Sequence, residues 1–378
     1  MYKYEDLIEE VKEFNTDLRY GLDDIVGVTI EKGLIPTIAN LTQTALDKFY
    51  IIKPETFVYN PRTHGVRLGM GYNDTCNTYI TTWNNVAFRV KDTAKNIVIP
   101  QYLWLYFCRP VWDRLTNFLA WGSSTIVFAW KDFLTIEIDL PSITRQREIV
   151  AEYETLTRRI RINEQMIQNL ESTAQTLYRK MFVDGIDKEN LPEGWRMGAI
   201  NDFCKEMKSG GTPSRNHNEY WNQDDYPWLK SGEVHNNIIV DVEEYISEAG
   251  LKNSSAKIIP SGSVVMAMYG ATAAQVAYLD CDTTTNQACC NMLCHSKEDA
   301  AYLFFHLLSN QEEIKKLANG GAQENLSQEL IAQQPMILLE DNKLKGLFVP
   351  ILDNLVVRYK ENFKLTELQS LLLAKMGK

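Results

Sequence analysis

The 378-residue sequence predicts an α+β protein in which two globular domains alternate with two long helices. The first indication is a heptad seam in the middle of the chain, a pattern typical of a helix that packs against a partner helix. Its apolar positions alternate in steps of four and three residues: Ile149, Tyr153, Leu156, Ile160, Ile167, Leu170, Ala174, Leu177 and Met181, with Asn163 at the one polar position.

The second indication is a looser seam near the C-terminus, formed by Leu344, Leu347, Ile351, Leu355, Leu365, Leu368 and Leu372. The third is that each seam follows a globular stretch of similar length. The chain is therefore predicted to be an internal repeat. We expect a first domain at 1–141, a central helix at 142–182, a second domain at 183–340 and a C-terminal helix at 341–378.

Local patterns predict the elements of each domain. In the first half, 1–15 is typical of a Glu-rich amphipathic helix and 101–120 of a second helix, while alternating or short apolar runs predict strands at 25–30, 49–52, 56–59, 86–90 and 135–141. In the second half, 302–318 is typical of a helix, and strands are predicted at 245–246, 256–259, 263–268, 275–279 and 289–293. The segment 335–339 then leads into the last helix.

The two long helices are expected to pair antiparallel within the chain, which relates the two domains by a pseudo-two-fold axis. A helix of roughly 40 residues rises about 60 Å, which corresponds to roughly 17 base pairs of DNA. Such a rod could hold two recognition domains at a fixed separation. Asn163 is a candidate for fixing the helix register, because a buried polar side chain favours one alignment over others. The alternative is a stalk that only joins domains or subunits.

Composition excludes several classes of protein. The formal net charge of −10 argues against a uniformly basic nucleic-acid coat, although local patches decide DNA binding. The seven cysteines form no Cys-x-x-Cys pair, which favours free thiols over a zinc site or disulfides. No apolar run reaches the roughly 18 residues of a membrane-spanning helix. The N-terminus does not resemble a signal peptide, so a cytoplasmic protein is expected.

The common catalytic motifs are missing from the sequence. It contains no Gly-x-x-x-x-Gly-Lys-Ser/Thr phosphate loop and no Gly-x-Ser-x-Gly elbow. The five histidines are scattered, and Asn60-Pro61-Arg62 lacks the second proline and the aromatic residue of an amino-group methyltransferase motif. These absences favour a binding protein over an enzyme.

One stretch of the second half is specific enough to suggest a family. Ser209-Gly210-Gly211-Thr212-Pro213-Ser214 is followed by Glu219-Tyr220-Trp221 and by Tyr226-Pro227-Trp228-Leu229-Lys230-Ser231-Gly232-Glu233-Val234, with Leu191-Pro192-Glu193-Gly194-Trp195 ahead and Thr284-Thr285-Asn286-Gln287-Ala288 behind. In this order, with a heptad helix on each side, the chain resembles the specificity (S) subunits of Type I restriction-modification systems. The first half is similar more loosely, through Phe57 to Pro61 and the loop 62–72, and lacks the Gly-Gly-Thr-Pro element.

The resemblance implies a subunit without catalytic activity or a cofactor of its own. It implies that each recognition domain reads one part of a split double-stranded DNA site, and that the paired helices set the gap between the parts. The implied partners are two methyltransferase subunits, which use S-adenosylmethionine, and restriction (motor) subunits, which use ATP and Mg²⁺.

Candidate DNA-binding residues follow from loop position and side-chain chemistry. Gly210 and Gly211 could let the backbone approach a phosphate, and Lys208, Arg215 and Lys230 are candidate phosphate contacts. Polar and aromatic loop residues are candidate base contacts: Thr212, Ser214, Tyr269, Thr272 and Asn286 in the second domain, and Arg62, Thr63, His64, Arg67, Asn73 and Asn84 in the first. An alternative function for Asn84 and Asn286 is to bind backbone groups, and for Trp221 and Trp228 to fill a core.

The leading hypothesis is therefore a DNA sequence-specificity subunit of a methyltransferase and site-specific deoxyribonuclease complex. The alternative is a coiled-coil interaction scaffold that binds no nucleic acid. An enzyme is the third hypothesis.

Overall fold

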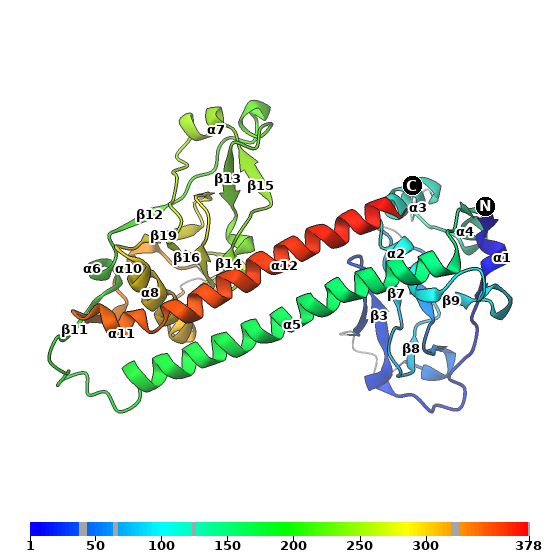
Figure 1. The fold of residues 1–378 in the computed structure, drawn as a ribbon, viewed down its shortest axis with the longest axis horizontal. Helices are drawn as coiled ribbons and strands as arrows, with labels where there is room; N and C mark the ends of the chain where they lie inside the picture. The colour runs from blue at the N-terminus through cyan, green and yellow to red at the C-terminus, as the bar shows by residue number, and fades with distance from the viewer. Residues whose placement is uncertain (38–43, 63–66, 123–125, 319–324, 377–378) are drawn as a thin grey trace. The chain divides into compact units, whose positions relative to one another are not determined.

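The computed structural model describes residues 1–37, 44–62, 67–122, 126–318 and 325–376 and divides into two compact units (Figure 1). Unit 1 contains Met1–Arg158 and Leu365–Lys378, and unit 2 contains Arg159–Lys364. Each unit mixes helices and strands and includes a segment of both long helices, α5 (Ile143–Phe182) and α12 (Val349–Lys375). The predicted α+β class is confirmed.

Unit 1 is built on an antiparallel sheet whose strand order is β2-β9-β6-β7. These strands are β2 (Ile8–Glu10), β9 (Val86–Val90), β6 (Phe57–Tyr59) and β7 (Met70–Tyr72). Smaller ladders pair β1 (Tyr2–Lys3) with β10 (Glu137–Ile138), β3 (Val26–Val28) with β4 (Leu34–Pro36), and β5 (Tyr50–Ile52) with β8 (Tyr79–Thr81). The short helices are α1 (Tyr4–Leu7), α2 (Pro100–Phe107), α3 (Pro110–Leu119) and α4 (Trp130–Thr135).

The core of unit 1 is rich in aromatic side chains. The rings of Phe57 and Phe88 stack across β6 and β9 at 5.0 Å. Phe133 from α4 contacts Phe88, and Trp112 from α3 contacts Phe133. All of these side chains are buried. Aromatic pairs contribute beyond their buried area, so this cluster holds the helices against the sheet.

Unit 2 contains a five-stranded sheet with the order β12-β19-β16-β17-β14. The strands are β12 (Glu206–Ser209), β19 (Cys289–Leu293), β16 (Val264–Ala267), β17 (Val276–Leu279) and β14 (Asn237–Ile239). Two further sheets join β15 (Glu244–Ile246), β13 (Tyr226–Leu229) and β18 (Thr284–Thr285), and β11 (Trp195–Ala199) with β20 (Pro335–Leu339). The helices are α6 (Ile200–Phe203), α7 (Glu248–Lys252), α8 (Lys297–Ser309), α9 (Gln311–Lys315), α10 (Gln328–Ala332) and α11 (Asn342–Gly346).

The two units repeat one plan. In both, a strand paired with the last strand of the unit leads into a one-turn helix and then into the sheet, as β1-α1-β2 and as β11-α6-β12. In both one-turn helices the third residue is an aspartate whose carboxylate accepts the backbone N–H of the residue before the helix: Asp6 accepts from Lys3, and Asp202 accepts from Ala199. The order β2-β9-β6-β7 matches β12-β19-β16-β17 strand for strand. The chain is therefore an internal repeat in structure as well as in spacing.

Within each unit, α5 and α12 run antiparallel. In unit 1, Tyr153 of α5 and Leu373 of α12 line the same cavity, and Gln369 Nε2 donates to Thr157 Oγ1 at 2.7 Å. In unit 2, Asn163 Nδ2 donates to Asn362 Oδ1 at 2.8 Å, and the rings of Tyr178 and Phe348 lie 6.2 Å apart. In both units the contacts move backward along α12 as they move forward along α5, so the expected antiparallel pair is present.

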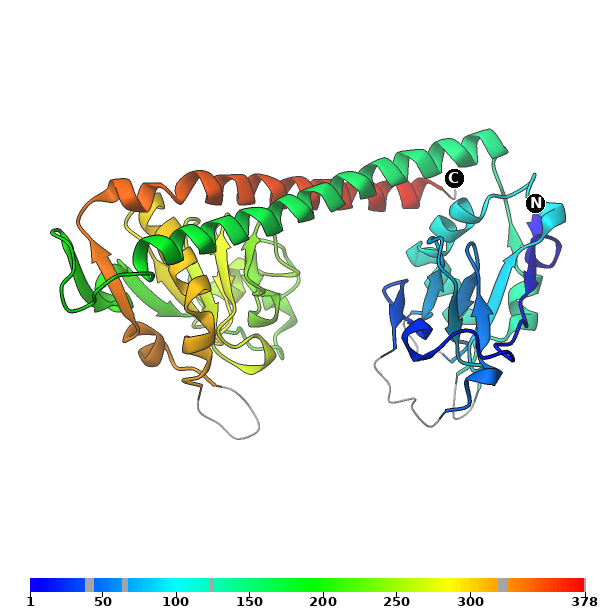
Figure 2. The ribbon, with the colours of Figure 1, turned by 90° about the horizontal axis from the view of Figure 1, so that it is seen from below.

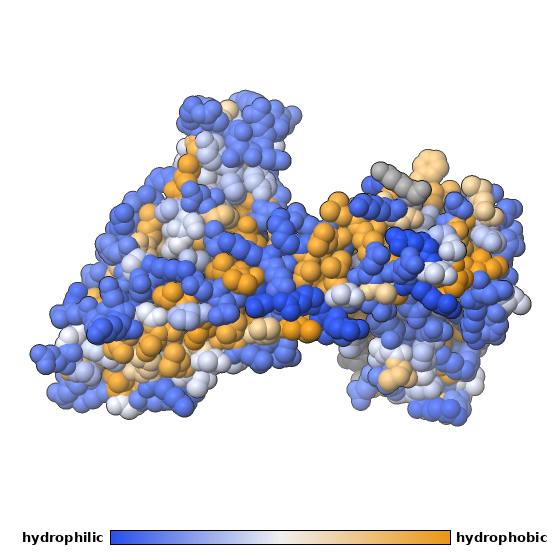
Figure 3. All heavy atoms as spheres, viewed as in Figure 1, coloured by the Kyte–Doolittle hydropathy of each residue, from blue (hydrophilic) through white to orange (hydrophobic). Residues whose placement is uncertain are grey.

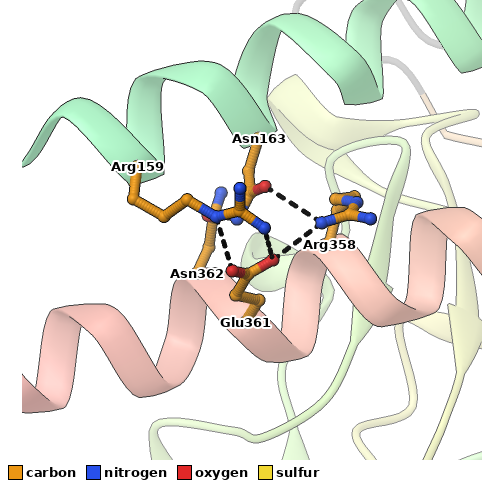
Figure 4. A network of polar contacts seen from close by, with 5 residues as sticks. All are labelled: Arg159, Asn163, Arg358, Glu361 and Asn362. Atoms are coloured by element: carbon orange, nitrogen blue, oxygen red, sulfur yellow. Dashed lines mark hydrogen bonds and ion pairs between the residues drawn. The ribbon is translucent and has the colours of Figure 1, made fainter. Parts of the chain in front are cut away.

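Asn163 is the centre of a polar network in the helix pair of unit 2 (Figure 4). Its side chain is fully buried and lies between Asn362 and Arg358, whose Nη1 reaches Asn163 Oδ1 at 3.4 Å. Arg159 donates through Nε and Nη2 to the two carboxylate oxygens of Glu361, at 2.6 and 3.0 Å, which holds the pKa of Glu361 below its usual value. Each helix contributes to every contact of Asn163, so these bonds form in one alignment only.

The N-terminal helix predicted at 1–15 is wrong, because only Tyr4–Leu7 is helical there. Strands β1 and β2 flank it and pair with distant segments, Tyr2 with Ile138 and Ile8 with Val90. These long-range ladders outweigh the helical preference of a Glu-rich segment. Likewise, the strand predicted at 256–259 is reduced to one isolated bridge between Ile259 and Thr283.

The predicted helices around 101–120 and 302–318 are each divided in two. The first is broken at Arg109, because Pro110 has no N–H to donate and begins α3 instead. The second begins earlier than predicted, where Ser296 caps the N-terminus of α8, and it breaks at Asn310. The strand predicted at 135–141 is limited to β10, because the helix α4 extends to Thr135.

The predicted C-terminal seam is met in part. Leu344, Ile351, Leu355, Leu365 and Leu372 are buried or half-buried, whereas Leu347 and Leu368 are 49% and 50% exposed. The inner side of this segment also includes residues that were not predicted: Phe348, Leu352, Tyr359, Asn362, Gln369, Leu373 and Met376. The segment is rich in leucine at neighbouring positions, and the helix break between α11 and α12 shifts the register. In α5, by contrast, the predicted stripe from Ile149 to Met181 consists of buried and half-buried positions.

Candidate nucleic-acid interface

In unit 2, the candidate residues gather at one end of the five-stranded sheet, which we call the loop end. There β12 and β16 finish and β17 and β19 begin, so the segments 209–212, 268–275 and 286–288 meet. The opposite end of β17 faces α12, where Lys360 Nζ lies 2.6 Å from a carboxylate oxygen of Asp280. Within unit 2 the loop end is therefore directed away from its part of the long helices (Figure 2).

Gly210 and Gly211 are buried and pack against protein backbone. A Cβ on Gly210 would lie 2.2 Å from the carbonyl oxygens of Thr285 and Asn286, and one on Gly211 would lie 2.4 Å from the carbonyl carbon of Ser255. The Gly211 N–H donates to Thr285 O at 2.8 Å. The absence of side chains thus permits close packing of three chain segments, rather than opening a phosphate cradle.

Three further candidates at the loop end differ in exposure and in hydrogen bonding: Tyr269, Thr272 and Asn286. Tyr269 is 43% exposed. The Thr272 hydroxyl donates to Ser231 O at 3.0 Å, and Asn286 Oδ1 accepts the N–H of Ala288 at 3.1 Å. Asn286 thus binds the backbone through its carbonyl oxygen, which agrees with the alternative function considered for it, while its amide nitrogen makes no hydrogen bond to a described residue.

The three candidate phosphate ligands are all ion-paired inside the unit. Lys208 Nζ lies 2.8 Å from Glu206, Arg215 lies 2.6 Å from Glu244, and Lys230 bridges Glu243 and Glu244 at 2.7 and 3.0 Å. Hydrogen bonding from Arg215 and Lys230 lowers the pKa of Glu244, and Glu243 raises that of Lys230. A phosphate could bind these cations only by competing with carboxylates.

Arg215 also belongs to an aromatic cluster. Its guanidinium carbon lies 3.5 Å from the ring centre of Trp221 and 5.0 Å from that of Trp228. Trp228 is buried and donates to Gly211 O, while half-buried Trp221 donates to Ser214 O. Both tryptophans therefore act as core residues here. Thr212 is exposed, and its hydroxyl bonds Gln287 Oε1.

In unit 1, the equivalent loop end holds Arg62 and Asn84. Arg62 follows the end of β6, and Asn84 lies in the turn before β9, which is the strand partner of β6. Both side chains are exposed, and neither has a side-chain partner among the described residues. The buried bond in this turn is made by the next residue, Asn85, to Thr81 Oγ1.

The structure separates the remaining unit 1 candidates from this end. Asn73 is buried beyond the other end of β7, where its amide donates to the carbonyls of Ile52 and Asn77. Arg67 is exposed and lines a cavity of about 340 Å³ with Trp104, Tyr153 and Leu373. Thr63 and His64 lie outside the described residues.

Polar residues that the sequence reasoning missed also occupy the loop end of unit 2. Ser209 Oγ donates to Gln328 Oε1, and Gln328 Nε2 donates to Met207 O, which ties α10 to the end of β12. Asn325 and Gln287 are exposed beside them. Gln287 adjoins Asn286 and could have been named from the sequence, whereas Asn325 reaches this end only through a long-range contact.

Two further findings concern the described residues alone. None of their helices combines the length and apolarity that crossing a bilayer requires. Nor do their His, Cys, Asp and Glu side chains form a group of three or more that could hold a metal ion.

Comparison with known proteins gives consistent matches. Residues 192–355 match the family described as "Type I restriction modification DNA specificity domain". The Type I restriction enzyme HindI specificity subunit of Haemophilus influenzae is 23% identical over 384 residues, which cover 80% of this chain and 81% of that protein. The Type I restriction enzyme EcoR124I/EcoR124II specificity subunit of Escherichia coli is 26% identical over 134 residues, 35% of this chain and 32% of that protein.

Among solved structures, the crystal structure of a Type I restriction-modification S subunit from M. genitalium has the same fold, with a TM-score of 0.57. The sequences are 15% identical, and the match covers 100% of this chain and 95% of that one. Residues 192–355 thus carry the DNA specificity domain of Type I restriction-modification systems. Over most of its length the chain is similar in sequence to a Type I specificity subunit, and its fold is that of such a subunit.

Proposed function

We propose that this specificity subunit binds double-stranded DNA with one loop end in each domain, and that each domain reads one part of a split site. The observation that carries the proposal is the repeated strand order, β2-β9-β6-β7 and β12-β19-β16-β17, with exposed polar loops at the equivalent end. Two copies of one binding plan suit a target in two parts. We propose recognition domains at 1–141 and 183–340, joined by the helices 142–182 and 341–378.

The loop end of the first domain offers a freer cation than that of the second. Arg62 is exposed and forms no ion pair with a described carboxylate, whereas Lys208, Arg215 and Lys230 are ion-paired. Phosphate contacts release counterions and dominate affinity. We therefore expect the first domain to contribute more of the salt-dependent affinity, and the second to bind less tightly by itself.

We further propose that α5 and α12 set the gap between the half-sites and dock two methyltransferase subunits. Apolar side chains lie at the surface along the helices (Figure 3). In unit 2 these are Ile162, Met166 and Val357, and in unit 1 Leu368 and Leu371, each between 38% and 57% exposed. Exposed apolar positions on long helices are typical of protein contacts.

The chemistry is assigned to the partner subunits. The methyltransferase subunits would use S-adenosylmethionine, and restriction subunits would add ATP- and Mg²⁺-dependent cleavage. This chain would supply sequence recognition alone and hold no cofactor.

The test is selection of methylated DNA by the complex of the full chain with its methyltransferase subunit. The library carries two randomised half-sites separated by gaps of varied length. We expect enrichment of one split sequence with one gap, and binding that weakens steeply with salt. A complex that methylates without sequence preference contradicts the proposal. Methylation by the isolated chain would instead establish an enzyme.

The competing scaffold function predicts no DNA binding at any salt concentration. The family match at residues 192–355 favours DNA recognition over that alternative.

A further inference from the structure

Beyond the end of β6 in unit 1 and of β16 in unit 2, the chain forms a short antiparallel pairing with another segment of the same unit, which we call the extension of that strand. In unit 1, Phe128 N donates to Pro61 O at 2.8 Å, which sets Arg62 directly opposite Val127 in an antiparallel bridge. In unit 2, Leu326 N donates to Met268 O at 2.8 Å, which sets Tyr269 directly opposite Asn325. The two extensions have the same hydrogen-bond pattern and follow equivalent strands, β6 and β16.

This pattern determines where the side chains lie. Arg62 and Val127 share no hydrogen bond with each other, and neither do Tyr269 and Asn325. Opposed residues of this kind are about 4.5 Å apart at Cα and project from the same face of the ladder. Arg62, Tyr269 and Asn325 are all exposed.

A third segment widens the row in unit 1. Trp121 and Val127 exchange both backbone hydrogen bonds, at 3.1 and 3.0 Å, so the indole stands in line with Arg62. Trp121 is 65% exposed, and its Nε1 donates to Asp132 at 3.2 Å, which fixes the ring. Each unit thus presents one aromatic side chain and one side chain with several hydrogen-bonding groups: Trp121 with Arg62, and Tyr269 with Asn325.

We propose that these rows are the base-reading positions of the two domains, with Arg62 reading a guanine in one half-site and Asn325 reading an adenine in the other. This inference rests on the proposed function. An arginine fork matches guanine O6 and N7, and an asparagine amide matches adenine N6 and N7 in the major groove. The two rows are equivalent but their residues differ, and the reading side chain stands on the β6 extension in unit 1 and on the segment opposite the β16 extension in unit 2. The same scaffold therefore reads different bases in its two halves.

The experiment compares methylation patterns of the full complex over DNA with every base at each half-site position. Arg62→Ala and Asn325→Ala should each reduce discrimination at one position by roughly 5- to 100-fold, in different half-sites. Arg62→Lys keeps the charge but loses the fork, so it should also relax that position while retaining affinity. Asn325→Asp should shift the preference at its position from adenine to cytosine, because a carboxylate accepts from cytosine N4.

Matched controls lie at the opposite ends of the same domains. Lys95→Ala removes an exposed lysine paired with Asp92, and Asn201→Ala removes an exposed asparagine in α6. Neither should change the pattern. Only variants that co-purify with the methyltransferase and have the wild-type unfolding temperature are compared. If Arg62→Ala does not fold, Arg62→Lys is used in its place.

The outcomes separate this inference from the proposed function. A wild-type complex without sequence preference would contradict the function itself. A sequence-specific wild type whose pattern is unchanged in the Arg62 and Asn325 variants would overturn the base-reading assignment alone. Equal weakening on all sequences, restored by Arg62→Lys, would make Arg62 a phosphate contact and also overturn it.

Discussion

Gly210 and Gly211 lie so close to neighbouring backbone that unit 2 has no space for a side chain at either position. A methyl group at either residue would lie 2.2 to 2.4 Å from backbone atoms that cannot move independently. We expect Gly210→Ala and Gly211→Ala each to destabilise unit 2 by about 1–3 kcal/mol, the usual cost of overpacking. Gly232→Ala is the matched control, because nothing lies within 4 Å of its added methyl group. Urea unfolding of the full chain measures the difference, and equal stability of all three variants would contradict it.

The same glycines mark the limit of reasoning from residues alone. They belong to one of the motifs that carry the family resemblance, but they pack against backbone of Thr285 and Ser255, which come from distant segments, and this packing differs from the expected phosphate cradle. Lys230 and Arg215 were named for their charge. Their partners are Glu244, the first residue of β15, and Glu243 just before it, which only the fold places beside them. Long-range pairing cannot be read from a single sequence.

Within the helix pair, the buried bond between Asn163 and Asn362 predicts a measurable coupling. Asn163→Leu removes the amide that donates to Asn362 and should lower the free energy of unfolding by about 1–3 kcal/mol. The double variant with Asn362→Leu should recover part of that loss, because both polar partners are then replaced. Glu164→Ala, at an exposed neighbour, should change stability by less than about 0.5 kcal/mol. Strictly additive losses would show that the two side chains do not interact.

The contact between α8 and α5 predicts a pH dependence. His306 is buried with Nδ1 2.6 Å from the Tyr178 hydroxyl, and burial lowers its pKa from 6.5 to about 4. As the pH is lowered, His306 therefore takes up a proton near pH 6.5 in the unfolded chain but only near pH 4 in the folded chain. The stability of unit 2 should fall over that window as the pH is lowered. Thermal unfolding of His306→Gln should depend less on pH there, and an unchanged slope would contradict the assignment.

The elements differ in how far the sequence could predict them. The apolar seam of α5 could be predicted because its heptad pattern continues regularly along a helix of 40 residues and occupies one face of it. The C-terminal seam was predicted only in part, because leucines occupy neighbouring registers and the packing of Phe348 and Leu352 decides between them. The segment 1–15 was misread because its strands are two and three residues long and depend on partners far along the chain.

For the whole molecule, the proposed gap-setting function of the helices predicts the effect of lengthening them. Seven residues inserted after Arg158, with seven more after Lys364, keep both heptad stripes and add about 10 Å. At about 3.4 Å per base pair this should lengthen the preferred gap by roughly three base pairs, with both half-sites unchanged. With insertion into α5 alone, the helix pair should be destabilised, because the contacts of Thr157 with Gln369 and of Asn163 with Asn362 can no longer form in one alignment.

Three matched heptads give the sharper result. They add about 32 Å, close to one turn of DNA, so both domains should again meet the same side of the duplex. We expect a preferred gap that is longer by roughly nine base pairs. The affinity for DNA should be nearer to wild type than with one heptad, since the duplex need not twist to bring both half-sites to their domains. Methylation of a library of gap lengths by the full complex measures both quantities. If the preferred gap stays constant through both insertions, a partner subunit sets the spacing and the paired helices serve only to join the domains.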